Sequence, residues 1–283
     1  MILKQGLLGL SIILGIGLSA TTVEAATKYV KVGNTEHNYL KTKQTIKTTG
    51  PTKETQVTIP KGTIVEVKDN SHAADQKHGR VYVKLEMGRL SYHLRGDQPQ
   101  YLSRRLAATT ARFQKVRVPQ YVQYYSTQKT YPAGARRYRV ADGNLYAGIK
   151  VPANLYMTKN LTAPRLYVTA DGYLEYYKAA PMMDLNVAQT PTVSAKITKV
   201  KVVRSSGLRM LYTKTAIPAA ISDRVSQTGD QQYLTTIKRR YRYSATVCYQ
   251  RDRPTSVSNI QVAAQYLVKG HDFFMHTDDV MPD

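Results

Sequence analysis

Two short segments combine arginine or lysine with tyrosine in a pattern that suits binding of phosphate groups. The planar guanidinium of arginine donates in a fork that matches two phosphate oxygens, and a nearby tyrosine ring can stack on a sugar or on arginine. The sequence therefore predicts a site for polyanions on these segments. Its candidate residues are Arg136, Arg137, Arg139, Lys238, Arg240, Tyr241 and Arg242.

The second segment, residues 238–243, has the geometry of a cationic strand face. Side chains alternate along a strand, so Lys238, Arg240 and Arg242 are expected on one face and the two tyrosines on the other. Charges on one face would then lie about 7 Å apart, which resembles the phosphate repeat of a glycerol- or ribitol-phosphate polymer. The alternative is a solvated face whose arginines keep the sheet soluble while tyrosines pack inward.

Other reactive residue types give weaker patterns. Cys248 is the only cysteine, which excludes an intramolecular disulfide, and its strand-like surroundings favour a small buried hydrophobe over a nucleophile. His271 and His276 near the C-terminus form no complete ligand set for a metal. Asp142 and Asp171 stand beside glycine, as turn residues do. We expect no catalytic residues, no metal and no cofactor.

The elements that carry these residues are predicted to be strands. Tyrosine, valine, threonine and isoleucine are abundant, and apolar residues alternate with polar ones at residues 63–67, 81–85 and 199–203. Helical patterns are confined to two candidates, residues 98–112 and 256–267. The expected fold class is all-β, with two or three small barrels or sandwich modules in tandem.

A weak internal repeat suggests how the modules divide. Residues 55–62 resemble residues 127–134 and, less closely, residues 212–219; each has threonine, an apolar residue and then proline before a strand. From this spacing we expect a first β module over residues 26–110 and a second, degenerate one over residues 111–189. A third, β-rich module with an acidic tail would cover residues 190–283.

The first module resembles a known family. Ile59-Pro60-Lys61-Gly62-Thr63, followed by Val65-Glu66-Val67, Gly79-Arg80-Val81-Tyr82-Val83-Lys84 and Tyr101-Leu102, is similar to the SH3-like repeats of bacterial surface proteins. The similarity is greatest to S-layer-associated and SH3-type wall modules of lactobacilli and related Gram-positive bacteria, and it covers residues 58–102. It implies a small β-barrel, no catalysis and non-covalent attachment to cell-wall polymers. The later copies depart from the pattern.

The N-terminus has the layout of a secretory signal peptide. Lys4 precedes an uncharged, leucine- and isoleucine-rich run over residues 6–20, and Val23 and Ala25 supply small residues before a cleavage site. We expect cleavage after Ala25, removal of residues 1–25, and a secreted, extracellular protein associated with the cell wall. The run is short for a membrane span, and we expect no transmembrane anchor.

The net charge of the chain indicates which classes of binding partner to expect. The chain carries 41 Lys+Arg against 19 Asp+Glu, a net charge of +22. Such an excess favours polyanions, and the candidates outside a cell are wall polymers such as teichoic acid or peptidoglycan, anionic lipid surfaces, acidic glycans and nucleic acid. The leading hypothesis is an exported, non-catalytic surface protein held at the wall electrostatically. The alternatives are an adhesin for acidic host glycans or matrix, which would use Tyr121, Tyr124 and Tyr125, and a wall-polysaccharide hydrolase. Specific nucleic-acid binding is not expected.

Overall fold

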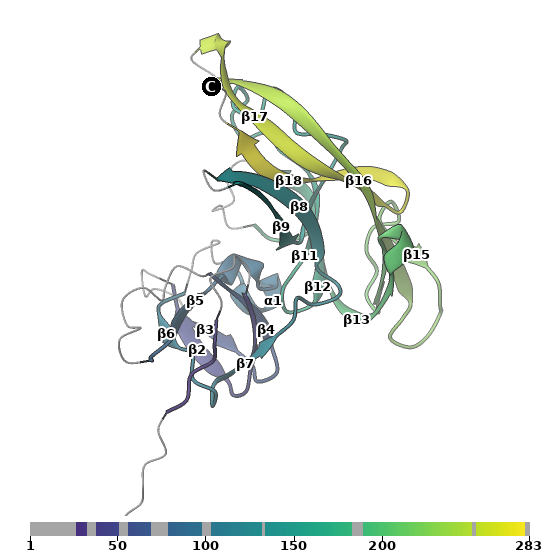
Figure 1. Cartoon of the computed structure of the whole chain (residues 1–283). Coiled ribbons are helices and arrows are strands. Elements are labelled where there is room, and N and C mark those ends of the chain that lie inside the picture. Colours follow the sequence, from purple (N-terminus) through teal and green to yellow (C-terminus); the bar gives the residue numbers. More distant parts are fainter. Residues whose placement is uncertain are drawn as a thin grey trace, which may run out of the picture.

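The structure is a computed structural model of the whole chain, and it confirms the all-β fold class (Figure 1). It describes residues 27–32, 38–50, 56–68, 79–97, 103–131, 134–182, 189–250 and 253–280. Side chains at 68, 124–131, 134–142, 250, 253–259 and 278–280 lie outside this description, as does the predicted signal peptide. Within the described ranges, no helix combines the length and the hydropathy of a membrane span.

The first part of the chain forms an N-terminal unit with its own core. Its main sheet has the order β6–β5–β4–β1–β7, and a separate hairpin pairs β2 with β3. Isoleucine, valine and leucine at alternate positions of these strands meet in one buried cluster that includes Leu40, Ile59 and Leu85. The strands are β1 (Asn38–Thr42), β2 (Ile46–Thr49), β3 (Gln56–Ile59), β4 (Ile64–Lys68), β5 (Tyr82–Leu85), β6 (Leu106–Ala107) and β7 (Phe113–Val116).

The rest of the chain is dominated by a nine-stranded antiparallel sheet that closes on itself. Consecutive strands pair from β10 to β14 and from β16 to β18, β14 pairs with β16, and β18 returns to β10. Only β15 (Asp223–Arg224) stays outside this ring, paired to one side of β16. The ring strands are β10 (Asn144–Ala147), β11 (Thr162–Val168), β12 (Tyr173–Pro181), β13 (Val193–Val203), β14 (Leu208–Thr213), β16 (Tyr233–Gln250), β17 (Arg253–Val268) and β18 (His271–Val280).

The inside of this closed ring is the main hydrophobic core. Alternate residues point inward, so β17 contributes Ala264, Tyr266 and Val268 while β18 contributes Phe273 and Met275. Every ring strand supplies at least one residue to this cluster. The residues that alternate with these core residues on each strand therefore face outward. Charged side chains at these outward-facing positions can reach solvent.

Two further elements pack around the ring. The hairpin of β8 (Gln123–Tyr131) and β9 (Gly134–Asp142) precedes β10 and forms a sheet of its own. A second buried cluster lies on the outer side of the ring, where Val151 and Leu155 of the β10–β11 connection cover Tyr167 and Phe274. The outer surface of the ring is thus covered by the β10–β11 connection on one side, and other parts of this outer surface are exposed to solvent.

A short helical segment of the N-terminal unit, η3 (Met87–Arg89) and α1 (Tyr92–Arg95), joins the two units. Ser91 donates through its backbone N–H and its hydroxyl to the two carboxylate oxygens of Asp171, at 2.8 and 2.6 Å. The Ala170 N–H donates to the Arg89 carbonyl at 2.7 Å, and the Tyr167 hydroxyl donates to the Gly88 carbonyl at 3.0 Å. These buried bonds lock the helical segment against the β11–β12 turn.

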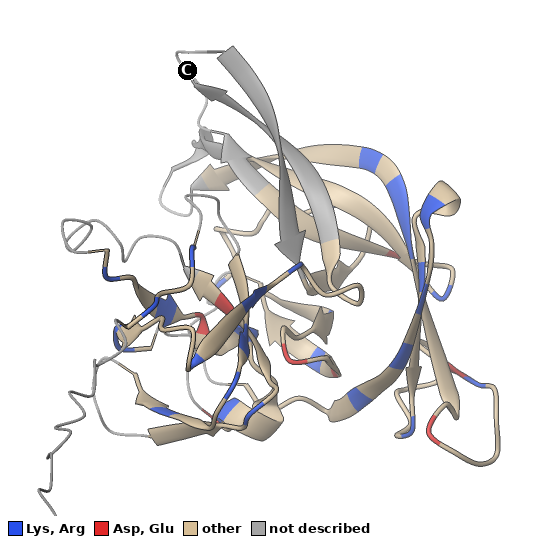
Figure 2. Ribbon diagram, turned by 60° about the horizontal axis from the view of Figure 1, so that its bottom comes forward, with Lys and Arg blue, Asp and Glu red and all other residues tan. Residues whose placement is uncertain are grey.

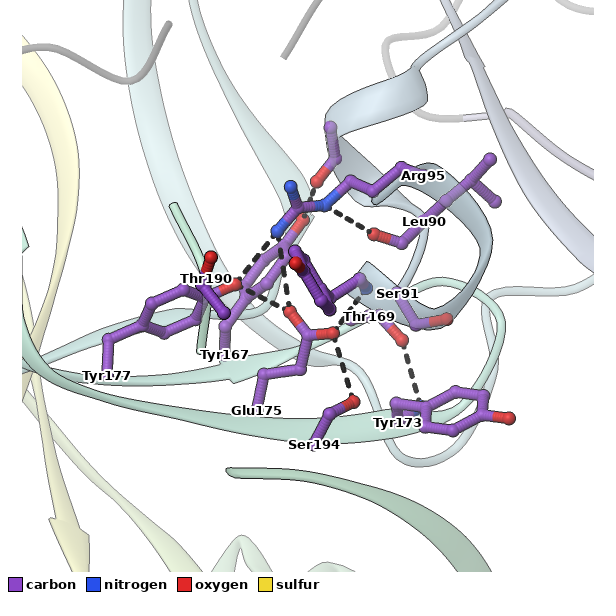
Figure 3. A network of polar contacts seen from close by, with 12 residues as sticks. Leu90, Ser91, Arg95, Tyr167, Thr169, Tyr173, Glu175, Tyr177, Thr190 and Ser194 are labelled. Carbon is purple, nitrogen blue, oxygen red and sulfur yellow. Dashed lines mark hydrogen bonds and ion pairs between the residues drawn. The ribbon is translucent and has the colours of Figure 1, made fainter. Parts of the chain in front are cut away.

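Glu175 of β12 lies at the centre of this junction (Figure 3). It is fully buried and accepts hydrogen bonds from the Tyr92 N–H, the Tyr177 hydroxyl at 2.6 Å and the Ser194 hydroxyl at 3.2 Å. Arg95 donates to the Tyr177 oxygen at 2.9 Å, and its Nη2 lies 3.7 Å from Glu175 Oε2. The buried charge pair is therefore surrounded by further donors, as burial requires.

The strand pairing differs from the predicted division into modules. The boundary predicted between residues 189 and 190 separates β12 from β13, but these strands pair in one sheet. The boundary predicted after residue 110 cuts off β7, which pairs with β1 in the N-terminal unit. Residues in the second and third predicted modules share one core, because strand patterns mark strands without specifying their partners.

The internal repeat and the predicted helices also differ from the structure. In the first copy β3 pairs with β2, whereas in the second β8 pairs with β9, so the copies are not equivalent. The helix predicted over residues 256–267 is wrong: these residues belong to β17, which pairs with β16 and β18. Within the other candidate, residues 103–112 form β6 and turns, and residues 98–102 lie outside the described residues. The strands predicted at 63–67, 81–85 and 199–203 coincide with β4, β5 and β13.

Candidate functional site

The buried carboxylates of the protein are committed to internal partners. Asp171 and Glu175 hold the junction between the units. Glu66, which is 5% exposed, accepts a hydrogen bond from the Tyr39 hydroxyl at 3.0 Å and lies 3.4 Å from the Arg89 guanidinium. None of these acids is placed to neutralise cations on the surface.

Three exposed carboxylates lie beside cations, and a fourth, Asp97, accepts hydrogen bonds from the Tyr92 and Thr190 hydroxyls. Asp272 accepts from Arg240 at 2.6 Å, and Asp223 lies 2.6 Å from Lys269. The Asp230–Lys214 pair is looser, at 3.9 Å, with both side chains well exposed. The many cations left over define the surface charge, and Figure 2 shows blue bands following the curved strands with little red.

A row of lysines lies on the outer side of β13. Ala195 packs in the core and Ile197 packs against it, and the register shift between Ile197 and Lys199 keeps the lysines facing outward. Lys196, Lys199 and Lys201 are all exposed. Because two residues of a strand rise about 7 Å, Lys199 and Lys201 present their charges at that spacing.

The row continues across the neighbouring strands as a basic outer face. Tyr212 of β14 pairs with Lys199, and both Lys199 and Lys201 place Nζ 5.9 Å from its ring centroid. Lys238 of β16 pairs with Leu208 and is exposed two strands away, about 10 Å from β13. We define the basic outer face as Lys196, Lys199, Lys201, Tyr212 and Lys238.

The second predicted segment begins at Lys238 of this face, and it is a bulge and not a regular strand. Arg239 pairs with Tyr266 and Tyr243 pairs with Ala264, so the pairing skips the residues between them on β16. Tyr241 has φ +57°, a left-handed conformation that is rare for an aromatic residue. The regular alternation predicted for residues 238–243 is therefore wrong, although Lys238, Arg240 and Arg242 are all exposed.

This bulge presents the Tyr241 ring at the surface, 56% exposed. The ring lies over Gly207, where an added Cβ would come within 2.8 Å of the tyrosine oxygen. Beneath it, the Arg239 guanidinium lies 4.9 Å from the ring centroid and donates to the Tyr243 hydroxyl at 2.8 Å. The arrangement is an exposed aromatic platform backed by a positive charge.

A second buried arginine strengthens the positive field at this end of the ring. Arg209 donates to the Gln120 carbonyl at 2.9 Å and to the Gln123 side-chain oxygen at 3.1 Å. Burial lowers the pKa of Arg209, and the nearby Arg239 charge lowers it further, against the opposing effect of Tyr266 and Tyr241. Two guanidinium groups, those of Arg209 and Arg239, thus interact electrostatically with Tyr241.

The first predicted segment is placed elsewhere. Arg136, Arg137 and Arg139 lie on β9, which pairs only with β8 in the described sheets, and their side chains lie outside the description. The two predicted segments are therefore on different sheets. Among the tyrosines of the adhesin hypothesis, Tyr121 is half-buried and donates to the Ala170 carbonyl at 2.7 Å, whereas the side chains of Tyr124 and Tyr125 lie outside the description.

Sequence reasoning missed the lysines of β13 and their tyrosine partner. The alternation of Lys199 and Lys201 with valine predicts a strand, and the same period also places both cations on one face. Tyr212 carries no local signal, because its position beside these lysines depends on pairing between β13 and β14.

The remaining reactive residues have structural surroundings. Cys248 is buried, as predicted, with its sulfur near the carbonyl oxygens of Pro152 and Thr246. His271 and His276 are both exposed on β18. In the described part of the chain, no group of three or more histidine, cysteine or acidic residues is arranged to hold a metal ion.

Comparison with known proteins found no matching family model, curated protein or solved structure. The resemblance of residues 58–102 to wall-binding repeats stays a prediction.

Proposed function

We propose that this protein is an exported, non-catalytic surface protein that binds anionic cell-wall polymers through the basic outer face and the Tyr241 platform. One observation carries the proposal: the carboxylates described above are buried, hydrogen-bonded or beside a cation, whereas lysines are exposed in a row along β13 and at Lys238 of β16. Teichoic acid is the favoured ligand, because its phosphates repeat along a flexible chain and its polyol or sugar units can contact tyrosine.

The spacing of the charges supports a linear polymer over a compact anion. Lys199 and Lys201 lie about 7 Å apart along the strand, and Lys238 lies about 10 Å across it. An extended chain of phosphodiesters can contact such points in turn, whereas one small anion reaches only one or two. Tyr212, between the lysines, offers an apolar surface to the uncharged part of the repeat.

The binding would be multivalent and sensitive to salt. Each exposed lysine–phosphate contact contributes little, but contacts on one polymer add through their effective concentration. Screening shortens the Debye length from about 10 Å at 0.1 M salt to about 3 Å at 1 M, so retention should fall steeply over this range.

The proposal is tested by co-sedimentation of residues 26–283 with purified Gram-positive walls, with and without teichoic acid. The test variant is Lys199→Glu/Lys201→Glu/Lys238→Glu. A matched control, Lys28→Glu/Lys47→Glu/Lys115→Glu, makes the same change of charge at exposed positions of the N-terminal unit. We expect teichoic-acid-dependent, salt-sensitive binding that the test variant loses and the control largely keeps.

Three results would contradict this function. Equal losses in both variants would mean that net charge, and not the basic outer face, determines retention. Binding that ignores teichoic acid but responds to sulfated or sialylated glycans on an array would favour the adhesin alternative. Clearing of wall polysaccharide in a zymogram would favour a hydrolase.

A further inference from the structure

A cleft of about 480 Å³ lies at the junction of the two units. Lys61 and Gly62 of the β3–β4 turn and His93 of α1 line it from the N-terminal unit, while Tyr173 and Lys196 line it from the ring. Clefts of roughly 300–1,000 Å³ hold small ligands, and junctions between folded units are a common place for them.

The side chains of the cleft favour an anionic group. Lys61, His93 and Lys196 are all exposed at its walls. Its carboxylate, Asp171, is 8% exposed, and both of its oxygens already accept hydrogen bonds from Ser91. Lys61 and Lys196 therefore face a ligand without a competing free carboxylate among the described residues that line the cleft.

One wall of the cleft is held in place by stacking. The His93 ring stacks on the Tyr173 ring, with centroids 5.9 Å apart and 20° between planes. Lys196 Nζ lies 4.4 Å from the same ring centroid and donates to the Asp171 carbonyl at 2.8 Å. These contacts fix the lysine at the edge of the cleft, which lowers the entropy lost on binding.

Lys196 also begins the lysine row of β13, so the cleft is continuous with the basic outer face. The cleft is continuous with the basic outer face, is lined by cations and has room for a small ligand. From these three observations we infer that the cleft binds one phosphate-bearing polyol or sugar unit. Its phosphate contacts Lys61 and Lys196, and the rest of the polymer follows β13. This inference rests on the proposed function and adds a pocket that a monomeric ligand can occupy.

The test is titration calorimetry of residues 26–283 with glycerol 3-phosphate, glycerol and inorganic phosphate in separate arms. We expect glycerol 3-phosphate to bind at one site per chain, inorganic phosphate more weakly, and glycerol not detectably. Lys61→Glu should weaken the binding of glycerol 3-phosphate at least about tenfold, because a favourable charged contact is replaced by charge repulsion. Lys47→Glu, at another exposed lysine of the N-terminal unit, should have no effect.

The outcomes separate this inference from the proposed function. If glycerol 3-phosphate fails to bind at about 10 mM, or Lys61→Glu and Lys47→Glu behave alike, the inference is overturned, whatever the walls show. Equal binding of inorganic phosphate and glycerol 3-phosphate would overturn the polyol or sugar specificity. Wall binding that survives Lys61→Glu, together with loss of glycerol 3-phosphate binding, supports both the cleft and the basic outer face as separate contacts.

Discussion

The junction between the units and the basic outer face use charge in opposite ways. At the junction, Glu175 and Arg95 are buried, and each has hydrogen-bond partners. On the basic outer face, Lys199 and Lys201 are exposed and approach only a tyrosine ring. The first arrangement holds two units together, and the second leaves charge available to a partner. Stability and binding should therefore respond to different mutations.

The largest expected effect is on the junction. Glu175→Ala removes a buried carboxylate and leaves Arg95 without its charge partner, which should lower the free energy of unfolding by about 3–5 kcal/mol. Urea denaturation monitored by tyrosine fluorescence measures it. Asp230→Ala, at an exposed ion pair, is the control and should cost less than about 1 kcal/mol. Similar losses in both would show that the junction is not a distinct stabilising network.

The second largest effect is expected at alkaline pH, which should weaken the junction. Burial, followed by the nearby charge of Asp171, raises the pKa of Tyr121, and burial and Glu175 raise the pKa of Tyr177. Since the unfolded pKa is near 10, this stability is complete below pH 10 and is lost as pH rises toward the folded pKa. The loss should be on the order of 1 kcal/mol per tyrosine at pH 11.

The slope of stability against pH is measured from urea midpoints between about pH 8 and about pH 11. Tyr121→Phe should be less stable at neutral pH, because the hydrogen bond to Ala170 is lost, but its decline above pH 10 should be shallower. An unchanged slope in this variant would exclude Tyr121 as a source of the alkaline effect.

A smaller effect is expected at the Tyr241 bulge, where strain and binding meet. Glycine tolerates the left-handed conformation, so Tyr241→Gly should be more stable than Tyr241→Ala by about 1 kcal/mol. Both remove the exposed ring and should weaken wall binding equally. Unequal binding would mean that the backbone, and not the ring, is what the ligand recognises. Thermal melts and co-sedimentation measure the two properties.

The smallest effect on stability is expected on the basic outer face. Lys199→Glu/Lys201→Glu/Lys238→Glu should change the free energy of unfolding by no more than about 0.5 kcal/mol per residue, since all three side chains are exposed. Its circular dichroism and urea midpoint provide the measurement. Marked destabilisation would show that these lysines are structural and would remove the contrast with the junction.

Local patterns predicted the strands but not their partners. The alternation at residues 199–203 identifies β13, because its period is set by the strand itself. The Ser91–Asp171 bonds join residues 80 apart, and no local pattern indicates such a pair. For the same reason a predicted module boundary falls between β12 and β13, which pair in one sheet, since the two strands have similar patterns whether they belong to one sheet or two.

The sequence indicates the exposure of the second basic segment but not its backbone geometry. Lys238, Arg240 and Arg242 are exposed as a basic segment should be, but Arg240 is paired with Asp272 and the alternation is broken at Tyr241. A bulge depends on how many residues the partner strand supplies, and that number comes from β17, not from the segment. Sequence periodicity cannot supply this information.

Closure of the ring has a consequence for folding kinetics. The last pairing joins Tyr146 of β10 to Phe274 of β18, residues 128 positions apart (274 minus 146). Contacts between such distant residues carry a large loop-closure cost and slow folding. The ring can close only after β18 is available. Until then the edges of β10 and β17 present unpaired backbone groups that invite association with other chains. A slow closing step should therefore limit the rate at which the protein reaches its native state.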